Sequence, residues 1–173
     1  MNDNNQNKNL VPAILLLAVA GLSRFIPHPG NFTAIGAMAL FSGAVIADRR
    51  LAFLLPMIVM LVTDFVLGLH VSMIPVYACF ALTVFIGTRI GSNPKFFKVV
   101  AGSLLASVIF YLVTNLPIWY ADQSLYPLTF AGTMESYTQA IPFFRNQVMG
   151  DLFYSGLLFG IFSLYRSTKR VTA

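Results

Sequence analysis

Charged residues are scarce in this chain of 173 residues, at 10% against the roughly 25% that is typical of soluble domains. Hydrophobic residues, by contrast, make up 57% of it. So apolar a surface must face something other than water. The composition therefore excludes an ordinary soluble protein and indicates a protein embedded in the lipid bilayer.

Cysteine and histidine are scarcer still. The single Cys79 excludes an intramolecular disulfide and any metal site built from several cysteines of one chain. His28 and His70 are the only histidines, and neither belongs to a zinc-binding pattern such as His-Glu-x-x-His. The sequence also lacks a phosphate-binding loop, a dinucleotide-binding glycine pattern and a Gly-x-Ser-x-Gly elbow. No cofactor of its own is therefore expected.

Six apolar stretches are long enough, or nearly so, to cross the hydrocarbon core as helices, which takes about 20 residues. They are residues 10–26, 32–47, 51–69, 71–90, 97–117 and 145–165. The second is short, and Pro27 and Pro29 before it predict a broken or re-entrant start. The expected fold class is all-α, a polytopic bundle of six transmembrane helices forming a single domain over residues 10–166.

Lysine and arginine are distributed unevenly among the expected connections. Nine lie in the N-terminal tail, the second and fourth connections and the C-terminus, whereas the other three connections hold only Arg24 and Arg145. Because basic residues collect on the cytoplasmic side, both termini are expected in the cytoplasm and the chain in a bacterial inner (plasma) membrane as a multi-pass protein. The net charge of +5 then reflects topology, and no nucleic-acid partner is expected.

The tails and one long connection complete the expected organisation. Residues 1–9 are polar and are predicted to be a disordered cytoplasmic tail, and residues 167–173 form the second cytoplasmic tail. Residues 119–144 are predicted to be an extracytoplasmic loop, with Trp119 and Tyr120 suited to anchoring at the interface. Within it, residues 128–141 predict a short amphipathic helix on or in the outer interface.

Small residues recur at every fourth position on three of the expected spans. They are Ala39, Gly43 and Ala47 on the second, Gly102 and Ala106 on the fifth, and Gly156 and Gly160 on the sixth. Such faces let helix backbones approach closely in lipid. Packing inside the bundle is favoured over contact with a partner subunit, and both interpretations stay open.

Polar groups gather in the outer half of the expected bilayer. They are Arg24, His28, Asn31, Asp64, His70, Tyr77, Asn115, Arg145, Asn146 and Asp151, with Cys79 about two turns into the fourth span. Ionisable groups in a membrane are costly and mark functional sites by default. A pump or channel would spread them across the whole thickness, whereas a site open to the outside needs them on one side. The structural alternatives are that Asp64 and Asp151 pair with Arg24 and Arg145, and that Cys79 is a small buried hydrophobic residue.

Three stretches resemble a known family. Over roughly residues 24–164, the chain is similar to solitary substrate-binding (S) components of the energy-coupling-factor (ECF) vitamin transporters. The likeness lies in PHPGNFTAIGAMALFSGA, in the Asp64 of LVTDFVLG, and in IPFFRNQVMGDLFYSGLLFG. The resemblance implies a six-helix bundle of S-component type with its site among the outer loops. It is nearest to members that bind cobalamin, in which a cysteine ligates the cobalt of the corrin.

The resemblance implies a ligand and a set of residues to hold it. Cys79 is the implied ligand to the cobalt of a bound cobalamin or related corrinoid, with His28, Asp64 and Arg145 in matching places. Tyr77, close to these by helix geometry, and Asn115 at the outer mouth complete the predicted substrate-binding set. A thiolate on cobalt would also displace cyanide, so a decyanating activity is compatible, although no catalytic residue is predicted.

One departure from the family pattern bears on partners. S components that dock on the shared energising module carry Ala-x-x-x-Ala in the first span. Here the residue four positions after Ala13 is Leu17, and the residue four positions after Ala18 is Leu22, so neither alanine forms this pattern. A solitary component is therefore favoured over a complex with the ECF energising module. Three alternatives stay open: uptake of another vitamin or small molecule, an intramembrane enzyme using Asp64, Asp151 and His28 as acid–base groups, and an assembly protein.

Overall fold

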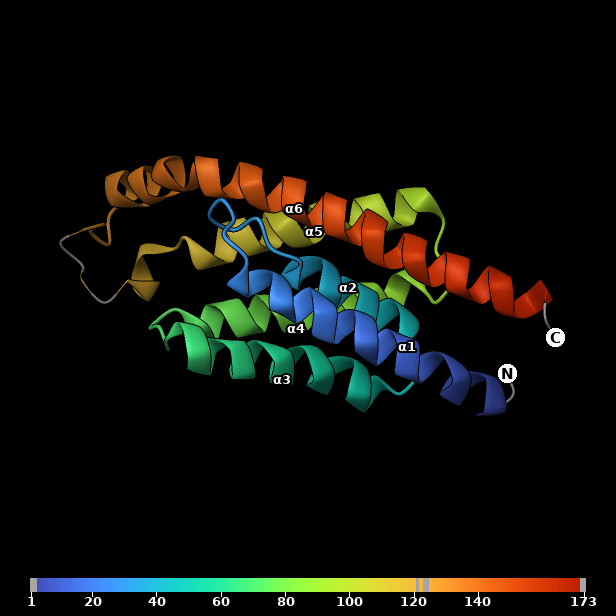
Figure 1. The fold of residues 1–173 in the computed structure, drawn as a ribbon. Coiled ribbons are helices and arrows are strands. Elements are labelled where there is room, and N and C mark those ends of the chain that lie inside the picture. The colour runs from blue at the N-terminus through green and yellow to red at the C-terminus, as the bar shows by residue number, and fades with distance from the viewer. Residues whose placement is uncertain (1–2, 121, 123–124, 172–173) are drawn as a thin grey trace.

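The computed structural model describes residues 3–120, 122 and 125–171, and within these residues it contains helices and no strand. The predicted all-α class is confirmed. The elements are α1 (Asp3–Leu22), η1 (Ser23–Phe25), α2 (Ile35–Val45), α3 (Arg49–Leu67), α4 (Met73–Ile90), α5 (Phe96–Thr114), η2 (Pro117–Trp119) and α6 (Phe130–Val171). The N-terminal end of α1 and the C-terminal end of α6 lie at one end of the bundle, and the α1–α2, α3–α4 and α5–α6 connections lie at the other (Figure 1).

Four of the six predicted spans are long and apolar enough to cross a membrane, namely α3, α4, α5 and α6. The other two are apolar but shorter, at Leu10–Phe25 and Ile35–Val45. The 11 residues of α2 extend about 16 Å at 1.5 Å per residue, roughly half of the hydrocarbon core. The predicted broken start is confirmed, because residues 26–34 are not helical and Asn31 has a φ of 65°. The second stretch is therefore a half-length helix.

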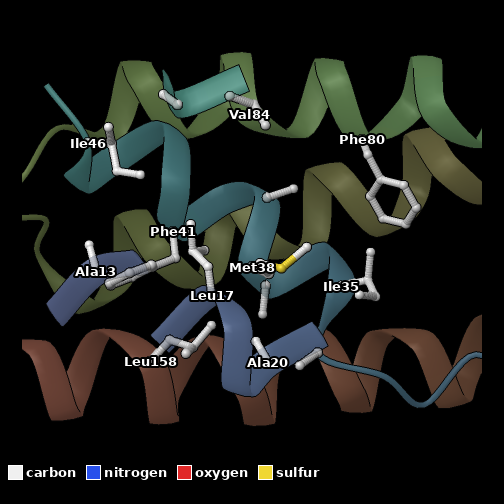
Figure 2. Packing of buried hydrophobic residues seen from close by; sticks show 14 of the residues in the cluster. Ala13, Leu17, Ala20, Ile35, Met38, Phe41, Ile46, Phe80, Val84 and Leu158 are labelled. Carbon is white, nitrogen blue, oxygen red and sulfur yellow. The ribbon is translucent and has the colours of Figure 1, made fainter. Parts of the chain in front are cut away.

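α2 forms the centre of the bundle. Nine of its residues are buried, and it contacts each of the other five α-helices. Figure 2 shows Met38 and Phe41 of α2 meeting Leu17 of α1 in the hydrophobic core. The Phe41 ring also packs edge-on against Phe159 and Phe162 of α6, with centroids 5.2 and 5.4 Å apart. Because it is enclosed by protein, α2 does not need the length that a lipid-facing helix requires.

The closest helix contact joins α2 and α4 through two glycines. A Cβ on Gly43 would overlap the carbonyl oxygen of Val84, and a Cβ on Gly87 would overlap that of Leu40. The predicted small-residue stripe on α2 is thus confirmed as an internal packing face at Ala39 and Gly43, although Ala47 is exposed.

The stripe predicted on the sixth span behaves differently. Nothing lies within 4 Å of a Cβ built on Gly156 or Gly160, and both glycines are exposed. The expectation of internal packing there was wrong, because α6 turns this face away from the other helices. Gly102 of α5 does pack inside, since its Cβ would lie 3.3 Å from Leu40.

α6 is one continuous helix of 42 residues, about 63 Å long. The predictions of an extracytoplasmic loop over residues 119–144 and of a separate helix over residues 128–141 were therefore wrong in their bounds: the helix begins at Phe130 and passes through Pro142. Its first turns are bound to the end of α5, because Tyr111 donates a hydrogen bond to the carbonyl of Tyr137 at 2.7 Å and Ser136 donates to that of Asn115 at 2.7 Å. These contacts hold the part of α6 before Pro142 against the end of α5.

The predicted tails also differ from the structure. α1 begins at Asp3, so the backbone of residues 3–9 is helical where disorder was expected, and α6 continues to Val171. Extending an existing helix costs far less free energy than starting one, so the helices formed by the first and last apolar segments continue into the polar residues beside them. Residues 1–2 and 172–173 lie outside the described residues.

Candidate solute-binding cavity

A cavity of about 300 Å³ is lined in part by the connections at the end of the bundle opposite the termini. Its exposed lining residues, His28, Asn31, Leu67 and His70, belong to the α1–α2 connection and to the end of α3 and the connection that follows it. Its buried lining residues are Ile35, Met60, Phe80, Gln147 and Asp151. The mouth is thus formed by the connections and the floor by the first turn of α2 with α3, α4 and α6.

The α1–α2 connection brings four polar residues to the lining: Arg24, His28, Asn31 and Thr33. The base of this connection is closed by the Ala34 N–H, which donates to Ser23 Oγ at 3.1 Å. Its tip is held to α6, because Asn146 Nδ2 donates to the carbonyl of Gly30 at 3.1 Å. Prolines 27 and 29 keep the segment between these points out of helix.

Asp151 of α6 caps the start of α2. The residue at the N-cap position, Ala34, has no side chain that can cap the helix. The Asp151 carboxylate instead accepts hydrogen bonds from the Ala37 backbone N–H and from the side chains of Ser107, at 2.7 Å, and Gln147. A carboxylate also interacts favourably with the positive end of the helix dipole. The approach requires Gly36, because a Cβ there would overlap Asp151 Oδ1.

A second buried carboxylate stands behind the cavity wall. Asp64 of α3 is completely buried, forms an ion pair with Arg24 and accepts a hydrogen bond from the Tyr77 hydroxyl at 2.7 Å. Arg24 Nη1 also contacts Thr63 Oγ1 and the carbonyl of Met60. This network joins the end of α1 to α3 and α4.

The structural alternative was therefore half right. Arg24 does pair with Asp64, as that alternative predicted. Asp151 does not pair with Arg145, which is exposed and forms no hydrogen bond or ion pair with another described residue. The serine of α5 and the first turn of α2 satisfy Asp151 in place of an arginine.

Of the six predicted substrate-binding residues, only His28 lines the cavity in the part of the chain that the structure describes. Asp64 and Tyr77 do not line the cavity themselves: Asp64 pairs with Arg24, which does line it, and Tyr77 donates a hydrogen bond to Asp64. Asn115 ends α5, where its side chain donates to the Tyr111 carbonyl at 2.9 Å. Arg145 is exposed on α6. Their roles in binding stay predictions.

Cys79 lies in the helix interface and not in the cavity wall. It is 1% exposed and shares one face of α4 with the buried residues Pro75, Thr83 and Gly87, at intervals of four. Gly87 on this face packs closely against α2. No group of three or more histidine, cysteine or acidic residues that could hold a metal ion occurs among the described residues, so a metal reaching Cys79 would have to bring its other ligands with it.

A protein-family model matches residues 3–172 of the chain. The chain belongs to the family of unknown function DUF6580. No curated protein and no solved structure matches it.

The cavity of the DUF6580 chain also contains residues that sequence analysis passed over. Gln147 precedes Asp151 by four residues, so the two lie on one face of α6, and that spacing could have identified it. Phe80 and Phe110 face each other with ring centroids 5.4 Å apart and form an aromatic wall. Their pairing depends on how α4 packs against α5, which no local pattern reveals.

Proposed function

We propose that this protein is a multi-pass protein of the bacterial plasma membrane that captures a small solute from the outer side, as the substrate-binding component of an uptake system. The observation that carries the proposal is the cavity itself. Its lining contains the buried polar side chains of Gln147 and Asp151, and its exposed lining residues lie in or beside the connections at one end of the bundle. Polar groups at membrane depth are tolerated where they line a solute site.

The charges at the two ends support the direction of capture. Basic residues lie at the end that holds both termini: Arg49 and Arg50 begin α3, Lys95 precedes α5, and Arg166 and Lys169 lie near the end of α6. Basic residues favour the cytoplasmic side, so the cavity mouth faces outward in this orientation.

The half-length α2 supports a transport role. Membrane transporters build their sites where helices stop inside the bundle, because the unpaired backbone groups of the helix end are then available to the substrate. Here α2 starts at the cavity floor, with Ile35 and Gly36 in the lining.

A corrinoid is the ligand that the resemblance to S components implies, with Cys79 bound to cobalt. About 300 Å³ is the lower end of the range for drug-sized ligands, and a corrinoid is much larger than these. Corrinoid binding therefore requires α4 to move so that Cys79 reaches the ligand. A smaller solute fits the cavity without that movement, and the geometry supports it better.

The resemblance also bears on energising. We favour a solitary component over one docked on an ATPase module, because the first span lacks the alanine pattern of the docked members.

A cavity-filling variant tests solute capture. Val76 lines the cavity on α4, whereas Ile74, on the same helix, is 75% exposed and faces away. The purified protein in lipid nanodiscs is screened by thermal unfolding against amino acids, nucleobases and water-soluble vitamins. We expect at least one compound to raise the unfolding temperature of the wild type and of Ile74→Trp but not of Val76→Trp.

The opposite results would count against solute capture. If no compound raises the unfolding temperature, or if Val76→Trp responds as the wild type does, the cavity is not a solute site.

A further inference from the structure

Arg24 presents unused donors to the cavity. Its contacts with Asp64, Thr63 and the Met60 carbonyl are all made through Nη1. The Nε and Nη2 hydrogens have no partner among the described residues, and the side chain, 17% exposed, lines the cavity. A guanidinium has five N–H donors in a planar fork, so this residue can still bind an acceptor group of a solute.

The same residue offers little net charge. Asp64 is completely buried against it, so the pair carries no net charge as the solute meets it. A full anion therefore gains less here than beside an unpaired arginine, and Asp151 in the same lining repels it further. The Arg24 end of the cavity favours an acceptor on a molecule that is not a net anion.

Asp151 offers the complementary group. Among the described residues it is the only acidic one in the cavity lining, and it accepts hydrogen bonds from Ser107, Gln147 and Ala37. An ionised carboxylate has about four acceptor positions, so one remains for a donor of the solute. The positive end of α2 offsets part of its charge, so a lone cation is not strongly favoured either.

Apolar side chains form a further part of the lining. Phe80 and Phe110 pair with ring centroids 5.4 Å apart, and Met60, Leu67 and Val76 also line the cavity. A ring or branched chain of the solute can pack against them, since aromatic rings pair with tilted or edge-on partners.

We infer that the cavity takes a small amphipathic solute of zero net charge, with an acceptor group at Arg24, a donor group at Asp151 and an apolar ring against Phe80 and Phe110. This inference rests on the proposed function and adds the charge class of the solute. Amino-acid-like zwitterions and their neutral amide counterparts belong to this class. Phosphorylated compounds and simple organic anions do not.

A series of probes with one ring and four charge states tests the inference. The probes are L-phenylalanine (zwitterion), 3-phenylpropionamide (neutral), 3-phenylpropionate (anion) and 2-phenylethylamine (cation). Their dissociation constants are measured by calorimetry on the nanodisc-embedded protein at pH 7. We expect the zwitterion or the amide to bind at least tenfold more tightly than either singly charged compound, a ratio that corresponds to about 1.4 kcal/mol.

An Asp151→Asn variant identifies the donor-binding group. It should lower the preference for the zwitterion over 3-phenylpropionate about tenfold, because the ammonium group loses its carboxylate partner. Asp48→Asn is the matched control, since Asp48 also caps a helix, accepting from the N–H groups of Arg50 and Leu51, but lies outside the cavity. That control should leave all four constants unchanged.

A double variant keeps the test decisive if Asp151→Asn does not fold. Arg24→Gln with Asp64→Asn removes both charges of the pair together and should weaken binding of the amide while leaving the cation unaffected.

Three results would overturn the inference: an anion or cation binding as tightly as the better of the zwitterion and the amide, an unchanged preference in Asp151→Asn, or no binding by any of the four probes. If the compound screen yields a solute that Val76→Trp excludes but that carries net charge, solute capture stands and the charge class fails. If the screen yields no solute, the proposed function fails with it.

Discussion

Oδ1 of Asp151, on α6, occupies the space that a Cβ on Gly36 would need, so the carboxylate lies directly against the first turn of α2. We expect Gly36→Ala to destabilise the protein by about 1–3 kcal/mol, the usual cost of overpacking a filled interior. The change would also push away the carboxylate that caps α2. Thermal and denaturant unfolding in detergent measures the loss.

Gly156→Ala is the control for that change. Nothing lies near this glycine, so the substitution should be neutral or stabilising by about 0.5–1 kcal/mol through helix propensity. The penalty of Gly36→Ala should shrink in an Asp151→Ala background. An equal penalty there would show that the overlap with the carboxylate is not its cause.

Removing one partner of the Arg24–Asp64 pair should be much worse than removing both. Asp64→Ala leaves the guanidinium without its counter-charge and should cost about 3–5 kcal/mol, whereas Arg24→Met with Asp64→Leu should cost far less, because no unpaired charge remains. A double-mutant cycle on unfolding free energies gives the coupling. Equal losses in the single and double variants would contradict a buried pair.

The position of Cys79 gives a prediction about corrinoids. Protein purified from cells grown with cyanocobalamin should show no corrin absorption bands, because the thiol is 1% exposed and lies outside the lining. Visible spectra of the wild type and of Cys79→Ala check this. Bands present in the wild type and lost in Cys79→Ala would instead support cobalt ligation and require α4 to open.

The proposed orientation can be checked with one cysteine at each end of α4. In a Cys79→Ser background, Val71→Cys should react with a membrane-impermeant maleimide in intact spheroplasts. Asn93→Cys should react only after the membrane is permeabilised, because it lies at the end that carries the basic residues. The reverse pattern would place the cavity mouth in the cytoplasm.

The sequence predicted the lipid-length helices better than it predicted their neighbours. The apolar runs that became α3, α4 and α5 are bounded by charged residues, glycine or proline, so their limits follow from composition. The loop predicted over residues 119–144 is instead helical from Phe130 onward, and the hydrogen bonds of Tyr111 and Ser136 join the first turns of α6 to the end of α5. Contacts between helices overrode a local signal there.

The sequence predicted that a cluster of polar residues exists, but not which residues contact one another in it. Asp64 and Arg24 stood out because charge is costly at membrane depth, and they do meet. Asp151 also stood out, but its partners are Ser107, Gln147 and the backbone of a helix start, and the last of these has no sequence signature apart from Gly36. The burial of Cys79 between helices could have been predicted, since Pro75, Thr83 and Gly87 share its face of α4 at intervals of four residues. The sequence does not show locally that the cavity is bordered by the face of α4 with Val76 and Phe80 and not by the face with Cys79, because this depends on how the helices pack.

The enclosed position of α2 has a consequence for biogenesis. A helix of about 16 Å is too short for insertion machinery to recognise as a membrane segment by itself. Its neighbours include α4 and α6, which the ribosome makes later. In the multi-pass membrane protein proposed above, the nascent chain would therefore have to keep this segment near the translocon or between partly assembled helices until α6 emerges. The centre of the molecule is completed last, and truncations before α6 should expose the segment to quality-control proteases.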